Sequence, residues 1–177
     1  MDITNSELII LGLIAEEPKY GYQIEQIIIQ RGIREWTDIG FSSIYYILNK
    51  LEEKTLLHSE KQAEGERPAR KIYRLTDLGR QEYQEAVRMR LTSPRPRTDD
   101  FDIGLANLLA LERSEILQAL TSHQTALKEK LEQVQAKYAL DGGDQLNEAA
   151  YELFDHSIAL LKAELDWVTA AIERHSQ

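Results

Sequence analysis

The chain of 177 residues contains no cysteine. It therefore has no disulfide framework, no thiolate metal site and no cysteine nucleophile, and such a composition suits the reducing cytoplasm. Long hydrophobic runs are also missing. The apolar stretch near the N-terminus is too short to cross a bilayer, and no basic segment precedes it as in a secretory signal. With 42% hydrophobic and 29% charged residues, the sequence predicts a cytoplasmic globular protein with no membrane partner.

Basic residues are in short supply. The chain has 21 Lys and Arg against 30 Asp and Glu, a net charge of −9, which at first argues against a nucleic-acid partner. The imbalance is uneven, however. Residues 1–98 hold 15 basic and 15 acidic side chains, whereas residues 99–177 hold 6 basic and 15 acidic ones. The whole negative excess thus falls in the C-terminal part, and this asymmetry indicates two segments with different roles.

Proline is rare as well, with four in the chain, and two of them mark a boundary. Residues 92–98 read Thr-Ser-Pro-Arg-Pro-Arg-Thr. The residue before a proline disfavours helix, and the polar side chains leave nothing to bury. The sequence therefore predicts a linker over 92–98 between a domain of residues 1–91 and a second domain of residues 99–177.

The segment before the linker predicts four helices and a β-hairpin. The expected helices cover about 5–17, 20–32, 42–54 and 76–91, and the expected strands about 56–61 and 69–75. The first helix is apolar on nearly all sides, and Asn5 or Ser6 is its expected N-cap. Three helices followed by a hairpin are the order of a winged helix-turn-helix, a DNA-binding module. The fold class is therefore mainly α.

The third helix has one apolar face, formed by Ile44, Ile47, Leu48 and Leu51, and one polar face. A helix in the major groove reads base edges with side chains near its N-terminal end, and basic residues on a wing hold phosphates. The expected base-reading residues are Ser42, Ser43, Tyr46 and Asn49, and the expected phosphate-binding residues are Tyr45, Lys50, Arg67, Arg70 and Lys71. On composition alone, the basic hairpin is also compatible with a solvated turn, and one of the two tyrosines with a place in the core.

The segment after the linker predicts a short helix and two long ones. The first long helix is expected to be capped by Ser114 and carries a heptad-like apolar seam: Ile116, Leu120, Leu127, Leu131, Val134 and Tyr138. The second is expected over about 144–175. One hairpin of such helices cannot bury both flanks, so a second copy of the chain is the expected partner. His123 interrupts the seam, where a polar residue specifying register is the simpler explanation and a ligand contact the alternative.

Enzyme chemistry finds no support in the sequence. The four histidines, His58, His123, His156 and His175, lack the spacing of a zinc site. The carboxylates after the linker and on the long helix are explained as helix-terminal and surface charges. No phosphate loop, nucleotide fingerprint or nucleophile elbow is present. We therefore expect a protein that is not an enzyme and that uses no metal or cofactor.

Several segments, taken in order, resemble the PadR family of bacterial transcriptional regulators. They are Tyr20-Gly-Tyr22, the run from Ser43 to Leu51, the run from Arg67 to Thr76, Gly79-Arg80 and the C-terminal Ala163-Glu-Leu-Asp-Trp167. The resemblance implies a homodimer that binds an inverted-repeat operator, usually represses, and is released by a small, often aromatic, effector. It places the family's recognition-helix tyrosine on Tyr45 and its basic wing residues on Arg67, Arg70 and Lys71.

The resemblance also gives a role in effector binding to Trp167, with His123 as the second candidate. Packing between helices is the simpler explanation for the tryptophan. Two positions depart from the family pattern. Thr55 stands where a glycine usually ends the recognition helix, so we expect a different turn into the wing, and Phe41 stands at a position that is commonly small or proline. The competing hypothesis is a dimeric winged-helix adaptor that binds proteins and not DNA.

Overall fold

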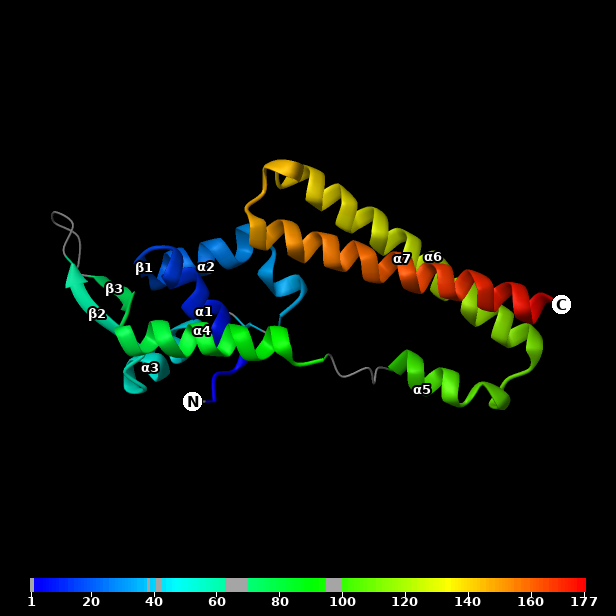
Figure 1. The fold of residues 1–177 in the computed structure, drawn as a ribbon, viewed down its shortest axis with the longest axis horizontal. Coiled ribbons are helices and arrows are strands. Elements are labelled where there is room, and N and C mark those ends of the chain that lie inside the picture. The colour runs from blue at the N-terminus through cyan, green and yellow to red at the C-terminus, as the bar shows by residue number, and fades with distance from the viewer. Residues whose placement is uncertain (1, 38, 41–42, 63–69, 95–99) are drawn as a thin grey trace. The chain divides into compact units, whose positions relative to one another are not determined.

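The computed structural model describes residues 2–37, 39–40, 43–62, 70–94 and 100–177 (Figure 1). Two residues expected at the DNA interface, Ser42 and Arg67, lie outside this described part, as does Phe41. The chain divides into two compact units, residues 1–96 and 97–177, and each is described by itself. Among the described residues, no helix is both long and apolar enough to cross a membrane.

The N-terminal unit has the expected order of helices and strands. Its elements are α1 (Asn5–Glu16), β1 (Lys19–Tyr20), α2 (Gly21–Gln30), the 3-10 helix η1 (Ile33–Glu35), α3 (Ser43–Glu53), β2 (Leu57–Gln62), β3 (Arg70–Leu75) and α4 (Asp77–Thr92). Three helices, a strand pair and a closing helix form a winged helix-turn-helix, so the expected fold class is confirmed.

The N-cap of α1 is Thr4, one residue before the first of the two N-cap residues that the sequence predicted. The Thr4 hydroxyl accepts a hydrogen bond from the Glu7 backbone N–H at 3.3 Å. The Glu7 carboxylate in turn accepts one from the Thr4 backbone N–H at 2.8 Å. This reciprocal capping box satisfies two N–H groups that a helix leaves open, so the prediction of Asn5 or Ser6 was wrong. At the other end the helix stops before Pro18, as expected.

The core of this unit is built around α1. Helix α1 packs against α3, α4 and β3, and its side chains on several sides are almost completely covered, as its all-round apolar sequence predicted. The most deeply buried apolar residues of the unit are Ile10, Leu11, Ile24, Ile28, Ile44, Leu48, Leu51 and Leu56. Each such side chain contributes roughly 1.5–3 kcal/mol of hydrophobic stabilisation. The α3 face named from the sequence lies entirely in this core.

The sheet has three strands, one more than the sequence predicted. Strands β2 and β3 pair antiparallel from Leu57 opposite Leu75 to Gln62 opposite Arg70. Strand β1 joins the free edge of β3, which gives the order β1-β3-β2. Two residues are too few to show the alternation that identifies a strand, so β1 could not be found in the sequence. Its pairing with β3 brings the start of α2 beside the wing.

The turn after α3 has the geometry that glycine favours, although the residue is a threonine. Thr55 has a φ of 58°. The backbone N–H of Leu56 donates to the Leu51 carbonyl, and that of Thr55 donates to the Glu52 carbonyl. These two bonds make a Schellman motif. The expectation of a different turn was therefore wrong: the hydrogen bonds and the burial of Leu56 hold Thr55 in a left-handed conformation that costs roughly 1–2 kcal/mol.

Close contact joins α4 to this turn. The Thr76 hydroxyl caps α4 by accepting from the Gly79 backbone N–H at 2.9 Å, as the sequence predicted, and it donates to the carbonyls of Thr55 and Leu56. A Cβ on Gly79 would lie 2.0 Å from the Leu56 carbonyl oxygen, so only glycine fits there. Leu78 and Leu91, expected on the inner side of α4, are exposed instead.

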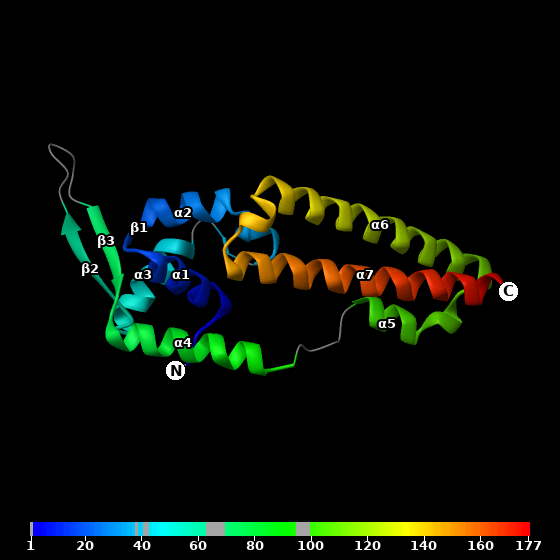
Figure 2. The ribbon, with the colours of Figure 1, turned by 45° about the horizontal axis from the view of Figure 1, so that its top comes forward.

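The C-terminal unit is a long antiparallel helix hairpin with a short helix beside it. Its elements are α5 (Asp100–Ala106), η2 (Leu108–Ala110), α6 (Arg113–Leu140), η3 (Gly143–Gln145) and α7 (Glu148–Ser176). Figures 1 and 2 both show α6 and α7 running side by side. Their core consists of Ile116, Leu120, Leu127, Val168 and Ala171. The remaining expected seam residues of α6 are half-buried.

Both long helices begin elsewhere than expected. Glu112, and not Ser114, is the N-cap of α6, in a capping box with Glu115. Helix α7 starts after Asn147, whose side chain accepts from the Ala150 backbone N–H at 3.0 Å; the residues from Gly143 form a separate 3-10 turn. Leu153, expected to point inward, is 49% exposed.

A buried carboxylate connects α1 to α3. Glu7 is only 1% exposed, and one of its oxygens lies 2.8 Å from the Lys54 ammonium and 3.1 Å from that of Lys50. Burial by itself would raise the pKa of Glu7. The hydrogen bonds from Lys54, the Thr4 backbone and Lys50 outweigh that effect and lower the pKa to about 2.

Replacing this carboxylate should make the stability of the unit less dependent on pH. The pKa of Glu7 is 4.5 in the unfolded chain and lower in the folded one, so its contribution is complete above about pH 5 and disappears as the pH falls towards 2. We expect Glu7→Gln to lower the free energy of unfolding by about 3 kcal/mol at pH 7. Urea unfolding followed by circular dichroism should show the two curves converging near pH 2.5. Glu53→Gln, an exposed change on α3, is the control, and a difference that stays constant with pH would contradict the assignment.

Candidate nucleic-acid interface

The outer face of α3 is polar and open. Tyr45 is 53% exposed and Tyr46 is 68% exposed, and Asn49 is exposed beside them. Neither tyrosine ring enters the core, so the simpler explanation for one of them does not apply. Ser43 lies at the first turn, where its hydroxyl donates to the Gly40 carbonyl at 2.6 Å. The expected base-reading residues that the structure describes thus share one accessible helix face.

Each lysine expected at phosphates has a carboxylate partner inside the unit. Lys50 forms its ion pair with Glu7, and hydrogen bonding to that carboxylate raises the pKa of Lys50. Lys71 lies 3.0 Å from Glu52 of α3, and hydrogen bonding to Glu52 raises its pKa as well. Both lysine side chains remain partly exposed, at 38% and 46%. The paired carboxylates therefore partly neutralise the positive charge of both lysines in the absence of a ligand.

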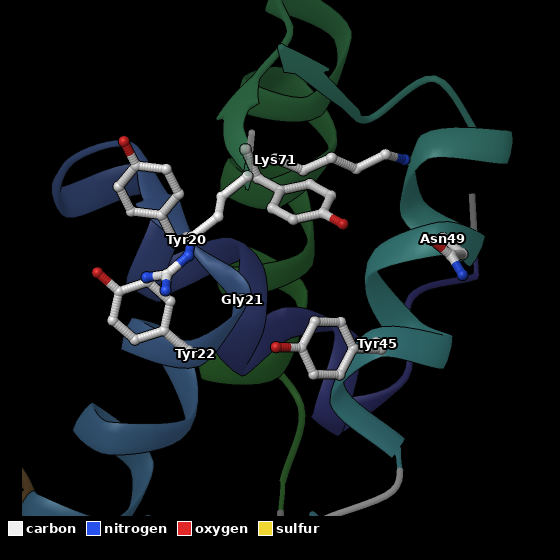
Figure 3. Close-up of a pocket in the computed structure, with 8 residues that line it drawn as sticks. Tyr20, Gly21, Tyr22, Tyr45, Asn49 and Lys71 are labelled. Atoms are coloured by element: carbon white, nitrogen blue, oxygen red, sulfur yellow. The ribbon is translucent and has the colours of Figure 1, made fainter. Parts of the chain in front are cut away.

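A hollow of about 600 Å³ lies between α3, the start of α2 and the wing strand β3 (Figure 3). Eight residues line it: Tyr20, Gly21, Tyr22, Tyr45, Asn49, Arg70, Lys71 and Tyr73. Four of them, Tyr45, Asn49, Arg70 and Lys71, are expected site residues that lie far apart in the sequence. The fold therefore brings the recognition helix and the wing to one place, as the interpretation as a DNA-binding module requires.

The segment Tyr20-Gly21-Tyr22 forms one wall of this hollow. The two tyrosine rings stack with centroids 5.7 Å apart, and the Arg70 guanidinium lies 5.1 Å from the centre of the Tyr22 ring. A Cβ on Gly21 would lie 2.6 Å from the Tyr45 ring, so glycine is what lets that ring approach α2. In Figure 3 the Tyr45 hydroxyl points into the space between α3 and Tyr22.

The site residues missed from the sequence are Tyr20, Gly21, Tyr22 and Tyr73. The first three were noted as a family motif but received no role, because the small strand that carries them to the wing is invisible in the sequence. Tyr73 lies on the inward face of β3 and is 3% exposed. In the sequence, a tyrosine at such a position looks like an ordinary packing residue. Conversely, Ser43, Tyr46 and Lys50 lie on α3 outside the lining of the hollow.

In the C-terminal unit, the two residues considered for effector binding both touch Phe101 of α5. The Phe101 ring stacks on His123 with centroids 4.1 Å apart and meets Trp167 edge-on at 5.9 Å. The second ring contact of Trp167 is with Arg174, whose guanidinium lies 6.0 Å from its centroid. His123 Nε2 also lies 3.0 Å from a carboxylate oxygen of Glu164. His123 therefore joins α6 to α7 while carrying Phe101 on its face, the kind of polar cross-link expected of a residue that specifies register.

Among the described residues, no group of three or more His, Cys, Asp or Glu side chains is placed to hold a metal ion. Three carboxylates of the N-terminal unit have lowered pKa values: Glu7, Glu16 and Glu52. Each accepts a hydrogen bond from a lysine or arginine side chain. For Glu16 the main cause is hydrogen bonding to Arg31. These are structural ion pairs rather than a pair of acids held in a cleft.

Comparison with known proteins agrees with this geometry. The profile of the transcriptional regulator PadR-like family matches residues 10–85. An uncharacterised protein of Lysinibacillus sphaericus is 34% identical over 80 residues, which cover 45% of this chain and 72% of that protein. The profile match includes the recognition helix α3 and the two wing strands β2 and β3.

Solved structures extend the likeness to the whole chain. Bacillus subtilis PadR in complex with operator DNA has a TM-score of 0.78 at 22% identity, with 97% of this chain and 99% of that chain covered. The same protein in complex with p-coumaric acid has a TM-score of 0.80 at 22% identity, with 97% and 98% covered. At this identity the likeness shows the fold. Together with the profile match, it shows that this chain belongs to the PadR-like family of transcriptional regulators, whose members are DNA-binding regulators and not enzymes.

Proposed function

We propose that this regulator is a repressor that binds an inverted-repeat operator as a homodimer and is released by a small aromatic effector. The observation that carries the proposal is the hollow in which the polar face of α3 meets the basic strand β3. A structure of PadR from Bacillus subtilis was solved with operator DNA, which supports DNA as the ligand of this chain. In a dimer, two such faces would meet successive turns of the duplex, about 34 Å apart.

The residues divide by chemistry. Ser42, Ser43, Tyr46 and Asn49 would contact base edges, since they carry hydroxyl and amide groups on the accessible side of α3 or just before it. Tyr45, Lys50, Arg67, Arg70 and Lys71 would hold phosphates. Glu7 and Glu52 neutralise part of the lysine charge, so we expect weak attraction to DNA of arbitrary sequence and strong dependence on a matched operator.

Removing the wing charges should weaken binding to every duplex alike. Each phosphate contact by a cation contributes about 0.9 to the slope of log K against log salt. We expect Arg70→Ala/Lys71→Ala to flatten that slope by up to about two, and less if Glu52 already screens Lys71. Fluorescence anisotropy with the duplex upstream of the protein's own gene, from 50 to 200 mM salt, measures it.

The matched control is Lys128→Ala/Lys130→Ala, which removes two exposed cations from α6. An unchanged slope in the wing variant would remove the wing from the interface. If the wild-type protein retards no duplex even at low salt, with or without small molecules, the competing proposal of a protein-binding adaptor replaces DNA binding.

The dimer is proposed from an apolar stripe on α7. Leu153, Leu160 and Trp167 are spaced by seven residues and remain 49%, 46% and 41% exposed. They lie beside the face that packs on α6, where Leu161 and Val168 are covered. A heptad-spaced apolar row left open on a long helix is typical of a helix that packs against another chain.

Charging this stripe should separate the subunits. Because carboxylates resist burial at an apolar interface, we expect Leu153→Glu/Leu160→Glu to be monomeric in analytical ultracentrifugation, with operator affinity reduced at least tenfold. Gln118→Glu/Gln133→Glu adds the same charge at exposed positions of α6 and should remain dimeric. A variant that stays dimeric would place the interface elsewhere.

The effector is proposed to bind near Trp167 and His123. The relative solved with p-coumaric acid supports a planar aromatic acid as the class of ligand. If p-coumaric acid binds, a concentration of 100 times its Kd should stabilise the protein by about 2.7 kcal/mol, which a thermal-shift assay detects. Trp167→Leu should abolish the shift, whereas Trp36→Leu, in the other unit, should keep it. Equal shifts in both variants would exclude Trp167 from the site.

A further inference from the structure

The hollow beside α3 is lined by a buried tyrosine whose hydroxyl has no hydrogen-bond partner among the described residues. Tyr73 is 3% exposed and lines the hollow, and no hydrogen bond to its hydroxyl occurs among the described residues. The hydroxyl oxygen is not fully buried. It therefore opens into the hollow. Burial raises the pKa of Tyr73, which keeps the phenol protonated and able to donate. The hydroxyl of this buried ring is therefore available to donate to a ligand in the hollow.

The guanidinium of Arg70 is held in place at the same hollow. It lies over the Tyr22 ring at 5.1 Å, and Tyr22 stacks on Tyr20. The Tyr20 hydroxyl donates to the side-chain oxygen of Gln62 at 3.1 Å, and Gln62 is the residue of β2 opposite Arg70. This chain of contacts orders the arginine before any ligand binds, which reduces the entropy lost on binding.

The N-terminal end of α2 also borders the hollow. Helix α2 starts at Gly21, which lines the hollow. Backbone N–H groups in a first helical turn have no acceptor within the helix, and the positive end of the helix dipole favours an anion. No carboxylate is among the described residues that line the hollow. The nearby Glu52 side chain is instead hydrogen-bonded to Ser59 and Lys71. The lining therefore offers donors and positive charge.

We infer that this hollow, here named the phosphate cradle, holds one phosphodiester of the DNA backbone between the recognition helix and the wing. Arg70 and the Tyr73 hydroxyl donate to the phosphate oxygens, and Tyr22 is a positioning residue for Arg70. The inference rests on the proposed DNA binding and adds residues to it. Sites for small molecules bury most of their ligand, whereas Tyr22 and Tyr45 at this hollow stay 36% and 53% exposed. That openness suits one unit of a long polymer.

Removing a single hydroxyl tests the cradle. Tyr73→Phe keeps the buried ring, so the fold should persist. We expect about tenfold weaker binding to the duplex upstream of the protein's own gene, the usual effect of losing a hydrogen bond to a charged group. The salt slope should not change, because no charge is removed. Tyr151→Phe, an exposed change on α7, is the control. Unchanged affinity in Tyr73→Phe would overturn its place in the cradle.

The positioning role of Tyr22 requires a double-mutant cycle. Tyr22→Leu should weaken binding several-fold in the wild-type background and have no effect in the Arg70→Ala background, since the guanidinium it orders is then absent. Additive losses would mean that Tyr22 acts independently of Arg70 and would contradict the positioning role.

A scan of the duplex with single neutral methylphosphonates locates the phosphate. In each half-site, the methylphosphonate at one position should weaken binding of the wild-type protein. The same methylphosphonate should not weaken binding of Arg70→Ala/Tyr73→Phe. Equal loss of sensitivity at all positions would contradict a cradle for one phosphate while leaving DNA binding intact. Absence of binding to any duplex by the wild-type protein would instead overturn both the proposed function and the cradle.

Discussion

The position of α3 depends on one buried carboxylate. Glu7 closes the capping box at the start of α1 and, with its other oxygen, accepts from Lys50 and Lys54 on α3. It thus fixes where the central helix begins and which way the recognition helix is turned around its own axis. The apolar contacts between α1 and α3 provide most of the stabilisation, but they are not directional. The charge-assisted hydrogen bonds supply the direction.

The same arrangement explains how an acidic protein can be a DNA-binding regulator. Over residues 1–98 the basic and acidic side chains balance, and Lys50 and Lys71 are each paired with a carboxylate. The arginine at the hollow is instead held by an aromatic ring, which orders it without neutralising it. The hollow therefore presents an ordered cation to a polyanion, whereas the acidic C-terminal unit disfavours one.

The sequence predicted the features that depend on local pattern. The buried face of α3 follows from helical spacing, and the start of α4 follows from the helical pattern that begins at residue 76. Features that depend on distant partners were missed. The Thr4 cap was missed although Thr4 and Glu7 have the spacing of a capping box, whereas the two-residue strand β1 exists only through its pairing with β3. Tyr73 gave no signal, since a buried tyrosine in a strand is usually a packing residue. Thr55 shows the reverse, where tertiary contacts override the preference of a residue.

The contact at Gly79 has a mechanical consequence. With its Cα pressed on the Leu56 carbonyl and the Thr76 hydroxyl bound to the same backbone, α4 has no hinge at its N-terminal end. The first turn of α4 and the turn between α3 and β2 therefore form one rigid junction.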